Sequence, residues 1–177
     1  MKQKLLLHCC CAPCATSVVE KLMNDYSVAL LYYNPNIRPK DEHDRRLSEL
    51  KKFADMLKFP LVQIDFNSCK KDFDTIYGGR ENMKEKSERC YLCYELRLKY
   101  ARDFAKEHGF NLFCTTLSVS PFKNAKWINE IGKRLSGENT NFLESDFKKN
   151  SGFQRSVELS KKYGMQRQNY CGCTPII

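Results

Sequence analysis

The sequence lacks long apolar runs, repeats and linkers. Its first ten residues, MKQKLLLHCC, carry basic residues but only three consecutive leucines, far short of a signal-peptide core. No stretch approaches the ~20 apolar residues of a membrane span. We therefore expect a cytoplasmic protein with no membrane partner. No internal repeat, low-complexity tract or Gly/Ser-rich linker divides the chain, which predicts one domain over residues 1–177.

Histidine is also scarce, whereas cysteine is abundant. Three histidines are scattered along the chain, which has ten cysteines. A chain of this length buries roughly two-thirds of its unfolded surface, so it folds without disulfides. In a reducing compartment, clustered cysteines are more often metal-binding or catalytic than disulfide-bonded. Eight of them fall into three groups: Cys9, Cys10, Cys11 and Cys14 in HCCCAPC, Cys90 and Cys93 in RCYLC, and Cys171 and Cys173 in YCGC.

The grouped cysteines favour a sulfur-rich metal site. The C-x-x-C spacing of Cys90 and Cys93, at the start of a predicted helix, lets two thiolates reach one metal or cluster. Sulfur donors favour zinc or an iron–sulfur cluster. One four-ligand site needs only two of the groups, so three groups indicate a larger site or two adjacent metals. Cys69 and Cys114 stand alone, and we expect both to be structural.

Three other interpretations compete with this one. Cys11 and Cys14 form a C-x-x-C at a helix start, where the helix dipole lowers a thiol pKa, as in thiol–disulfide oxidoreductases. That interpretation leaves the other two groups without a role. A zinc-stabilised RNA-binding module explains a closed four-thiolate site but leaves several cysteines unused. A sulfurtransferase of the nucleotide-binding α/β type would need a glycine- and serine-rich loop after the first strand, where this chain has cysteines and a proline.

Short apolar runs alternate with helical patterns along the chain. The runs suit buried parallel strands at 4–10, 27–33, 60–66 and 111–117. Helices are predicted from Pro13 to about residue 24 and over 41–58, 93–109, 124–137 and 151–164. The alternation predicts an α/β fold: a Rossmann-like, doubly wound, mainly parallel sheet of nucleotide-hydrolase or PP-loop-like topology, with helices on both faces.

This architecture predicts where a site forms. In an open α/β sheet, ligands bind beyond the carboxyl ends of the strands, near the point where the strand order reverses. Polar or sulfur-bearing segments follow each predicted strand: HCCCAPC, YNPN, DFN and TTLSVSP. We therefore expect their side chains to converge on one edge of the sheet.

Five segments together carry a resemblance to a known family. In order they are LLLHCCCAPC, YYNPNIRP, RCYLCYELRL, TTLSVSPFKN and DFKKNSGFQRSVELSKKYGMQRQNYCGC. They resemble the QueH-type epoxyqueuosine reductases, iron–sulfur enzymes of tRNA modification, over nearly the whole chain. The opening H-x-C-C-x-P-C and the closing Y-C-G-C are the most specific. Cys9 occupies a position that the family pattern leaves variable.

The resemblance implies the last step of queuosine synthesis. Epoxyqueuosine at the wobble position of a tRNA with a GUN anticodon loses its epoxide oxygen, which takes two electrons from a donor that the sequence does not identify. The family implies a [4Fe-4S] cluster and a neighbouring single iron, without cobalamin. A metal with an open position acts as a Lewis acid on the epoxide oxygen while the cluster relays electrons.

The resemblance implies the metal-binding cysteines, whereas Asp65 and the substrate-binding candidates come from their places in the predicted fold. The metal-binding set is Cys10, Cys11, Cys14, Cys90, Cys93, Cys171 and Cys173, with Cys9 doubtful, and Cys10 is also assigned a catalytic role. Asp65, at a predicted strand end, is the candidate oxygen ligand and second catalytic residue, with a helix cap or turn as the alternative. The substrate-binding candidates are His8, Tyr33, Asn34, Asn36, Thr115, Thr116, Ser118, Lys123 and Arg155, for which loop or turn structure is the alternative.

The charge balance suits an RNA partner. The chain has 30 Lys and Arg against 21 Asp and Glu, a formal net charge of +9. The alternative is a solubilising surface. A pool of basic residues near the predicted loops is expected to meet anticodon-loop phosphates: Arg38, Lys40, Lys123, Lys126, Lys148, Lys149, Arg155 and Arg167. Tyr32, Tyr33, Phe122 and Tyr170 are the candidates for stacking on unpaired bases.

Overall fold

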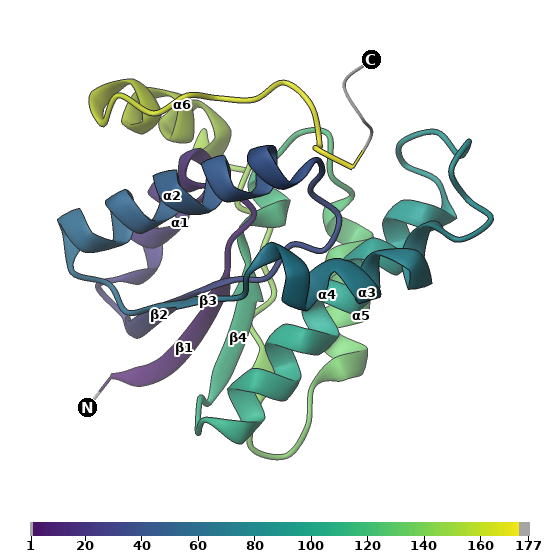
Figure 1. The fold of residues 1–177 in the computed structure, drawn as a ribbon. Helices are drawn as coiled ribbons and strands as arrows, with labels where there is room; N and C mark the ends of the chain where they lie inside the picture. Colours follow the sequence, from purple (N-terminus) through teal and green to yellow (C-terminus); the bar gives the residue numbers. More distant parts are fainter. Residues whose placement is uncertain (1, 174–177) are drawn as a thin grey trace.

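A computed structural model describes residues 2–173 and contains one five-stranded parallel sheet (Figure 1). The strand order is β3-β2-β1-β4-β5, so the order reverses between β1 and β4. The strands are β1 (Gln3–His8), β2 (Tyr26–Tyr32), β3 (Leu61–Gln63), β4 (Leu112–Thr115) and β5 (Asn141–Phe142). The predicted α/β class with a doubly wound parallel sheet is confirmed.

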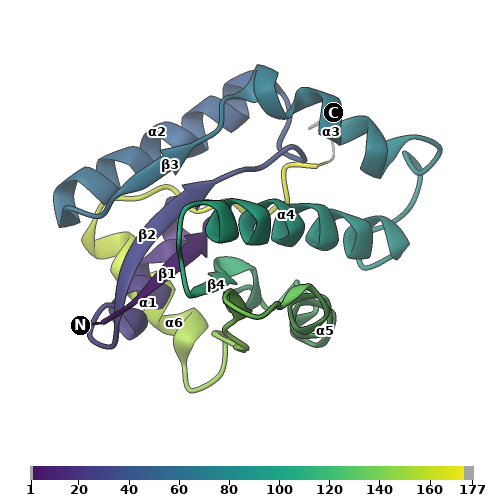
Figure 2. The ribbon, with the colours of Figure 1, turned by 90° about the horizontal axis from the view of Figure 1, so that it is seen from below.

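Helices cover both faces of the sheet. They are α1 (Ala12–Leu22), α2 (Lys40–Leu57), α3 (Phe66–Tyr77), α4 (Glu88–Glu107), α5 (Ala125–Leu135) and α6 (Gly152–Lys162). α1, α2 and α6 lie on one side of the central strands, whereas α4 and α5 lie on the other (Figure 2). Because both faces are covered, β1 is an apolar run whose three leucines are all fully buried.

Three details differ from the sequence prediction. β3 covers only Leu61–Gln63, and the end of the predicted strand is instead the start of α3. α4 begins at Glu88, so both cysteines of the RCYLC segment lie inside its first two turns. β5 is a two-residue strand that the sequence analysis did not predict.

The carboxyl ends of β1 and β4 meet at the point where the strand order reverses. β1 leads directly into α1, whose first turn contains Pro13, as predicted. β4 leads into a short 3₁₀ helix, Thr116–Val119. The register pairs His8 with Thr115, which places the cysteines after β1 beside this 3₁₀ helix.

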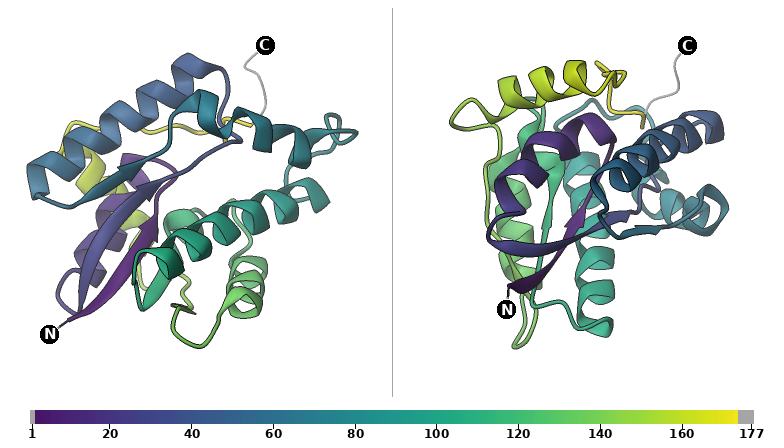
Figure 3. Two further views of the ribbon diagram at one scale, coloured as in Figure 1. Left: turned by 60° about the horizontal axis from the view of Figure 1, so that its bottom comes forward. Right: turned by 90° about the vertical axis from the view of Figure 1, so that its left-hand side faces the viewer.

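The far end of the chain returns to the same edge. Residues 163–173 run back along α2 (Figure 3), where the backbone N–H of Gln166 donates to Glu49 and Arg46 Nη1 donates to the carbonyl oxygen of Cys171. The two ends of the sequence therefore contribute to one region. Within residues 2–173, the structure has no helix that combines the length and the apolar composition of a membrane span.

Candidate metal centre

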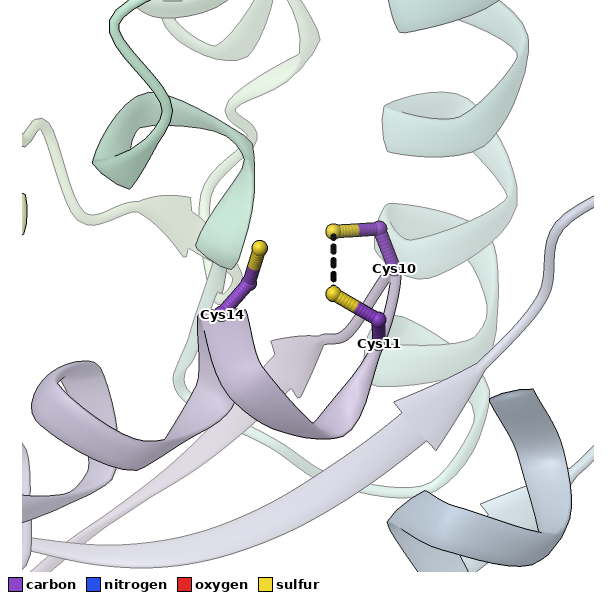
Figure 4. Close-up of side chains that lie close together, drawn as sticks. All are labelled: Cys10, Cys11 and Cys14. Carbon is purple, nitrogen blue, oxygen red and sulfur yellow. Dashed lines mark hydrogen bonds between the residues drawn. The ribbon is translucent and has the colours of Figure 1, made fainter. Parts of the chain in front are cut away.

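Three cysteines converge at the start of α1. The sulfur atoms of Cys10, Cys11 and Cys14 all lie within 4.8 Å of one another, and those of Cys10 and Cys11 are 3.8 Å apart (Figure 4). We call these residues the N-terminal sulfur group. Within residues 2–173, no other three His, Cys, Asp or Glu side chains bring their ligand atoms this close together.

The three thiols of the N-terminal sulfur group differ in pKa. Hydrogen bonds from the Cys11 and Cys14 thiols hold the pKa of Cys10 well below its usual value. The same hydrogen bonds to Cys10 raise the pKa of Cys11 and Cys14. The hydroxyl of Thr116 lies 3.6 Å from the Cys10 sulfur. Negative charge in the group is therefore favoured on Cys10 over Cys11 and Cys14, and binding a metal to all three sulfurs releases their protons.

A second set of cysteines joins α4 to the end of the chain. Cys93 and Cys173 are buried in one small cluster, and Cys171 packs against it. We call these three residues the C-terminal sulfur group. A hydrogen bond from Cys173, assisted by nearby Lys123 and Arg97, holds the pKa of Cys171 well below its usual value. Lys123 Nζ lies 3.1 Å from the Cys171 sulfur.

Cys90 lies one helical turn from Cys93 and is buried. Its sulfur accepts a hydrogen bond from the backbone N–H of Lys86, at 3.3 Å. The four cysteines of the second and third sequence motifs do not form a compact group of ligand atoms like the N-terminal one. The structure therefore brings both motifs into one neighbourhood without giving four equivalent ligands.

One cavity adjoins both sulfur groups. Its volume is about 190 Å³, and its lining includes Cys10, Cys11 and Cys14 together with Cys171 from the C-terminal group. Three basic side chains in its wall are largely buried: Arg46, Arg97 and Lys123. Asn36 and Tyr170 also line the wall, and Phe122, which is 56% exposed, lies at the surface. The cavity combines soft ligands, fixed positive charge and an aromatic border.

Arg46 and Arg97 were not among the site residues predicted from the sequence. Arg97 follows Cys93 by four residues on α4, so helical periodicity places both on one face. Arg46 lies on α2, and Nε donates to Glu42. The only sequence signal for Arg97 was its i+4 spacing from a grouped cysteine.

His8 is a support and does not offer a free ring nitrogen. Its Nδ1 is 2.8 Å from the Thr115 hydroxyl and its Nε2 is 3.0 Å from the carbonyl oxygen of Tyr33. Burial, and after it the charge of Arg97, lowers the pKa of His8 to about 3. The ring is therefore neutral and fixes the end of β1 to its neighbours.

The structure does not support Asp65 as a metal ligand or catalytic residue. Asp65 is the exposed N-cap of α3: Oδ1 accepts from the backbone N–H groups of Asn67 and Ser68 at 2.9 and 3.1 Å. Oδ2 accepts from the Ser68 hydroxyl at 2.6 Å. Both oxygens are engaged, and Asp65 does not line the cavity. The alternative of a helix cap is the one that the structure shows.

Cys9 and Arg155 also lie away from the cavity. Cys9 is fully buried in the main core, and its thiol donates to the carbonyl oxygen of Leu7 at 3.4 Å. Arg155 is exposed on α6 and pairs with Glu20 and Glu158. Neither side chain is placed to contact a metal or substrate in this cavity.

Some of the remaining substrate-binding candidates line the cavity, whereas others form hydrogen bonds within the fold around it. Asn36 and Lys123 line the cavity. Asn34 is buried and donates to the carbonyl oxygen of Cys9, whereas the Tyr33 hydroxyl donates to Asp72. Ser118 is buried and accepts from the backbone N–H of Phe147. Among Thr115, Thr116 and Ser118, Thr116 is the one that contacts a grouped cysteine, Cys10. The hydroxyls of Thr115 and Ser118 instead form hydrogen bonds within the scaffold, to His8 and Ser145.

The two isolated cysteines are buried and do not line the cavity, which agrees with the structural role expected of them. Cys114 is fully buried in the core on β4. Cys69 is buried on α3, and its thiol donates to the carbonyl oxygen of Asp65 at 3.0 Å.

Comparisons with known proteins identify the family. The model of the family described as "Epoxyqueuosine reductase QueH" matches residues 5–175. A protein of that name from Staphylococcus epidermidis is 37% identical over 188 residues, with 97% of this chain and 75% of the relative covered. Relatives of the same name from Acinetobacter baylyi and Thermotoga maritima are 37% and 31% identical, each over 96% of this chain and over 78% and 88% of their own lengths.

A solved structure supports the fold. It is the U34-tRNA thiolase NcsA from Methanococcus maripaludis with its [4Fe-4S] cluster, and it superposes with a TM-score of 0.61 at 11% identity. The alignment covers all of this chain and 62% of the thiolase, and at this identity it shows a shared fold alone. The family model and the curated relatives carry the assignment: the chain belongs to the QueH family of epoxyqueuosine reductases.

Proposed function

We propose that the protein is an epoxyqueuosine reductase that converts epoxyqueuosine at the wobble position of tRNA to queuosine. Membership of the QueH family carries this conclusion. In the reaction two C–O bonds of the epoxide break and one C=C bond forms, while two electrons and two protons turn the oxygen into water. The electrons come from an external donor, and a tRNA substrate places the enzyme in the cytoplasm.

The N-terminal sulfur group suits an iron–sulfur cluster. Cys10, Cys11 and Cys14 offer three soft donors within 4.8 Å of one another, at the edge of a cavity whose lining carboxylate, Glu85, pairs with Lys123. We assign these three residues as ligands of a [4Fe-4S] cluster. When bound, the cluster supplies the substrate with electrons one at a time. Cys9 is excluded from the ligand set because its sulfur lies in the core.

The C-terminal sulfur group is the candidate for the rest of the metal set. Cys171 faces the cavity and its thiolate is stabilised by neighbouring cations, while Cys93 and Cys173 lie beside it. These residues, with Cys90 as a further donor, provide either a fourth cluster ligand or the ligands of a single adjacent iron. With Asp65 assigned to a helix cap, sulfur dominates this set. The proposed chemistry requires no cobalamin.

Residues of the cavity wall are suited to hold the substrate. Lys123 is nine-tenths buried and its Nζ, which bears protons, lies between Cys171 and Glu85. An epoxide oxygen in the cavity gains negative charge as its C–O bonds break, and a nearby ammonium stabilises that charge. Asn36 offers an amide for the hydroxyl groups of the substrate ring.

The cavity fits a splayed-out nucleoside. Bases in an anticodon loop are unpaired, so a modified nucleoside can leave the loop and enter a pocket at low cost. Phe122 and Tyr170, at 56% and 39% exposure, are available to stack on neighbouring bases. The net charge of +9 favours the phosphate backbone. One domain carries all of these parts.

Metal content and turnover test the proposal together. Protein purified without air is expected to be brown, to contain roughly four or five irons with inorganic sulfide, and to convert epoxyqueuosine-containing tRNA when a chemical reductant is supplied. Nucleoside analysis by mass spectrometry measures the product. Stoichiometric zinc without sulfide would contradict the proposal and favour a zinc-stabilised RNA-binding module. A brown protein that leaves the epoxide intact would contradict the activity alone.

A further inference from the structure

Arg97 is a fully buried cation whose partners are neutral or sulfur. It is 1% exposed in the middle of α4. Nη2 donates to Asn34 Oδ1 at 2.6 Å, Nε lies 3.4 Å from His8 Nε2, and Nη1 lies 3.9 Å from the Cys93 sulfur. Across residues 2–173, no Asp or Glu forms an ion pair with it. A guanidinium in this setting lacks its usual counter-ion.

A buried charge needs a compensating charge. Burying an ion without a partner costs several kcal/mol, so buried arginines normally pair with carboxylates. Asn34 is an uncharged amide and His8 is an imidazole, so neither partner carries a negative charge. The remaining candidates for negative charge near Arg97 are sulfur atoms.

Both sulfur groups are placed to provide that charge. Arg97 lines the same cavity as Cys10 and Cys171, and it contacts Cys93 directly. It therefore adjoins both sulfur groups and belongs to neither ligand set. Lys123 and Arg46 line the same cavity, but both have carboxylate partners, Glu85 and Glu42. Arg97 is thus the cation most dependent on sulfur for compensation.

We propose that Arg97 is a positioning residue that sets the reduction potential of the iron–sulfur cluster, by acting as the buried counter-ion of both sulfur groups. The inference rests on the proposed cluster. Each electron that the cluster takes up adds one negative charge beside the guanidinium. A fixed positive charge stabilises the reduced state more than the oxidised state, and hydrogen bonds to cluster sulfurs act in the same direction. Arg97 therefore raises the potential and makes the cluster easier to reduce.

Three variants separate charge from packing. Arg97→Gln removes the charge and keeps some hydrogen bonding, whereas Arg97→Lys keeps the charge. Arg89→Gln is the matched control, because Arg89 is also buried on α4 but donates to the carbonyl oxygens of Arg80 and Glu81. The readout is the midpoint potential of the cluster in the intact holoprotein, from an anaerobic redox titration followed by electron paramagnetic resonance.

The expected result is an ordered series of potentials. In Arg97→Gln the ratio of reduced to oxidised cluster at a fixed solution potential falls about tenfold or more, a shift of about 59 mV for one electron. Arg97→Lys shifts less, and Arg89→Gln matches wild type. A cluster that loads in Arg97→Lys but is lost in Arg97→Gln also supports a charge requirement.

Two outcomes overturn the inference. An unchanged potential in a loaded Arg97→Gln protein removes the electrostatic role. Loss of the cluster in both Arg97 variants, with Arg89→Gln loaded, assigns Arg97 to folding. A wild-type protein that binds no iron would instead overturn the proposed function, and the inference with it. The wild-type metal analysis therefore distinguishes the two failures.

Discussion

Cys10 receives hydrogen bonds from the thiols of Cys11 and Cys14, and this asymmetry bears on how the site loads. A cysteine whose pKa is lowered gives up its proton more readily and so offers an incoming metal its first thiolate ligand. The next two ligands then lose their protons as they bind. At the scale of residues, the hydrogen bonds within the N-terminal sulfur group therefore favour binding of the first metal ion.

The N-terminal sulfur group gives the first prediction. Cys14→Ala removes one of its three donors, so we expect most of the iron and sulfide to be lost and tRNA deoxygenation to fall below detection. Metal analysis, the visible spectrum and nucleoside mass spectrometry measure the effect. Cys69→Ala is the matched control, because Cys69 is buried outside the cavity, and it is expected to keep both iron and turnover. Full activity in Cys14→Ala would remove this residue from the ligand set.

Asp65 provides the second prediction. Because both of its oxygens cap α3, Asp65→Ala is expected to lower the denaturation midpoint and to leave iron content and the cluster spectrum unchanged. Asp65→Asn should retain most of the stability, since an asparagine also caps well. Chemical denaturation and metal analysis of the same preparations give the answer. Loss of about one iron per chain in Asp65→Asn would restore a role as a ligand.

These residues show what the sequence can resolve at the smallest scale. Cysteine has few uses in a reducing compartment, so its clustering indicated a metal site without a structure. An aspartate between a strand and a helix can serve equally well as a metal ligand or as a helix N-cap. Which of the two roles it has depends on the direction of its side chain, which the sequence does not show. Arg97 was missed because a helical arginine is ordinarily a surface residue, and nothing local in the sequence shows that it is buried.

At the scale of elements, the predicted edge of the sheet holds the cavity. The apolar runs of β1, β2 and β4 are buried on both faces, a pattern that sequence shows clearly. β3 and β5 are short, and their pairing depends on neighbours distant in sequence. α3 was overlooked although Phe66, Cys69, Phe73 and Ile76 follow helical spacing, because the apolar run before it was extended too far.

The turn between Cys171 and Cys173 provides the third prediction. Gly172 has φ of +89°, and a Cβ there would lie 2.9 Å from Arg46 Nη2. Gly172→Ala is expected to displace the C-terminal sulfur group, lower bound iron and reduce turnover at least tenfold. Gly109→Ala is the control, since Gly109 also has positive φ but its added Cβ meets no atom within 4 Å. Equal effects of the two substitutions would trace the loss to backbone strain alone.

The contact between α2 and the C-terminal segment gives a fourth, pH-dependent prediction. Burial pushes the pKa of Glu42 upward, but hydrogen bonds from Arg45 and Arg46 and one from Tyr170 outweigh it and lower the pKa to about 2. Because the folded pKa lies below the unfolded value, the carboxylate stabilises the fold fully above about pH 4.5 and loses that effect as the pH falls toward 2.

Glu42→Gln isolates this contribution. At pH 7 the variant is expected to be less stable by roughly 1.5 kcal/mol, the scale of a hydrogen bond to a charged group. The difference in free energy of unfolding between the variant and the wild type should narrow as the pH falls from 4.5 toward 2. Urea denaturation of both proteins across that range measures it. If the same difference in free energy of unfolding persists at pH 3, the contribution of Glu42 to stability comes from its shape and not from its charge.

At the scale of the whole molecule, the site is assembled from both ends of the described chain. The N-terminal sulfur group follows β1, whereas Cys171 and Cys173 come at the end, after the chain has completed every helix and strand. The site therefore forms only when the entire fold is in place. The charge of +9 could be counted from the sequence. Which charges are available to RNA could not, because Lys123 is buried beside Cys171 and Arg155 is occupied by acidic partners.

That distinction shapes the last prediction. Lys126 is exposed in the first turn of α5, just beyond Phe122 and Lys123 of the cavity. Lys149 is also exposed, and the backbone N–H of its neighbour Lys148 donates to the carbonyl oxygen of Ser118. If the tRNA backbone crosses this side of the cavity, affinity for an epoxyqueuosine-containing anticodon stem-loop falls linearly with salt on logarithmic axes. Each single-stranded phosphate contact contributes roughly 0.7 to the slope.

The double variant Lys126→Glu, Lys149→Glu is expected to weaken binding at least tenfold and to flatten the slope by about 1.4, with the cluster spectrum unchanged. Reversing Lys52 and Lys106, which are exposed on α2 and near the carboxyl end of α4, is the charge-matched control and should have a smaller effect. A slope identical in the two double variants would show that net charge, and not this surface, attracts the RNA.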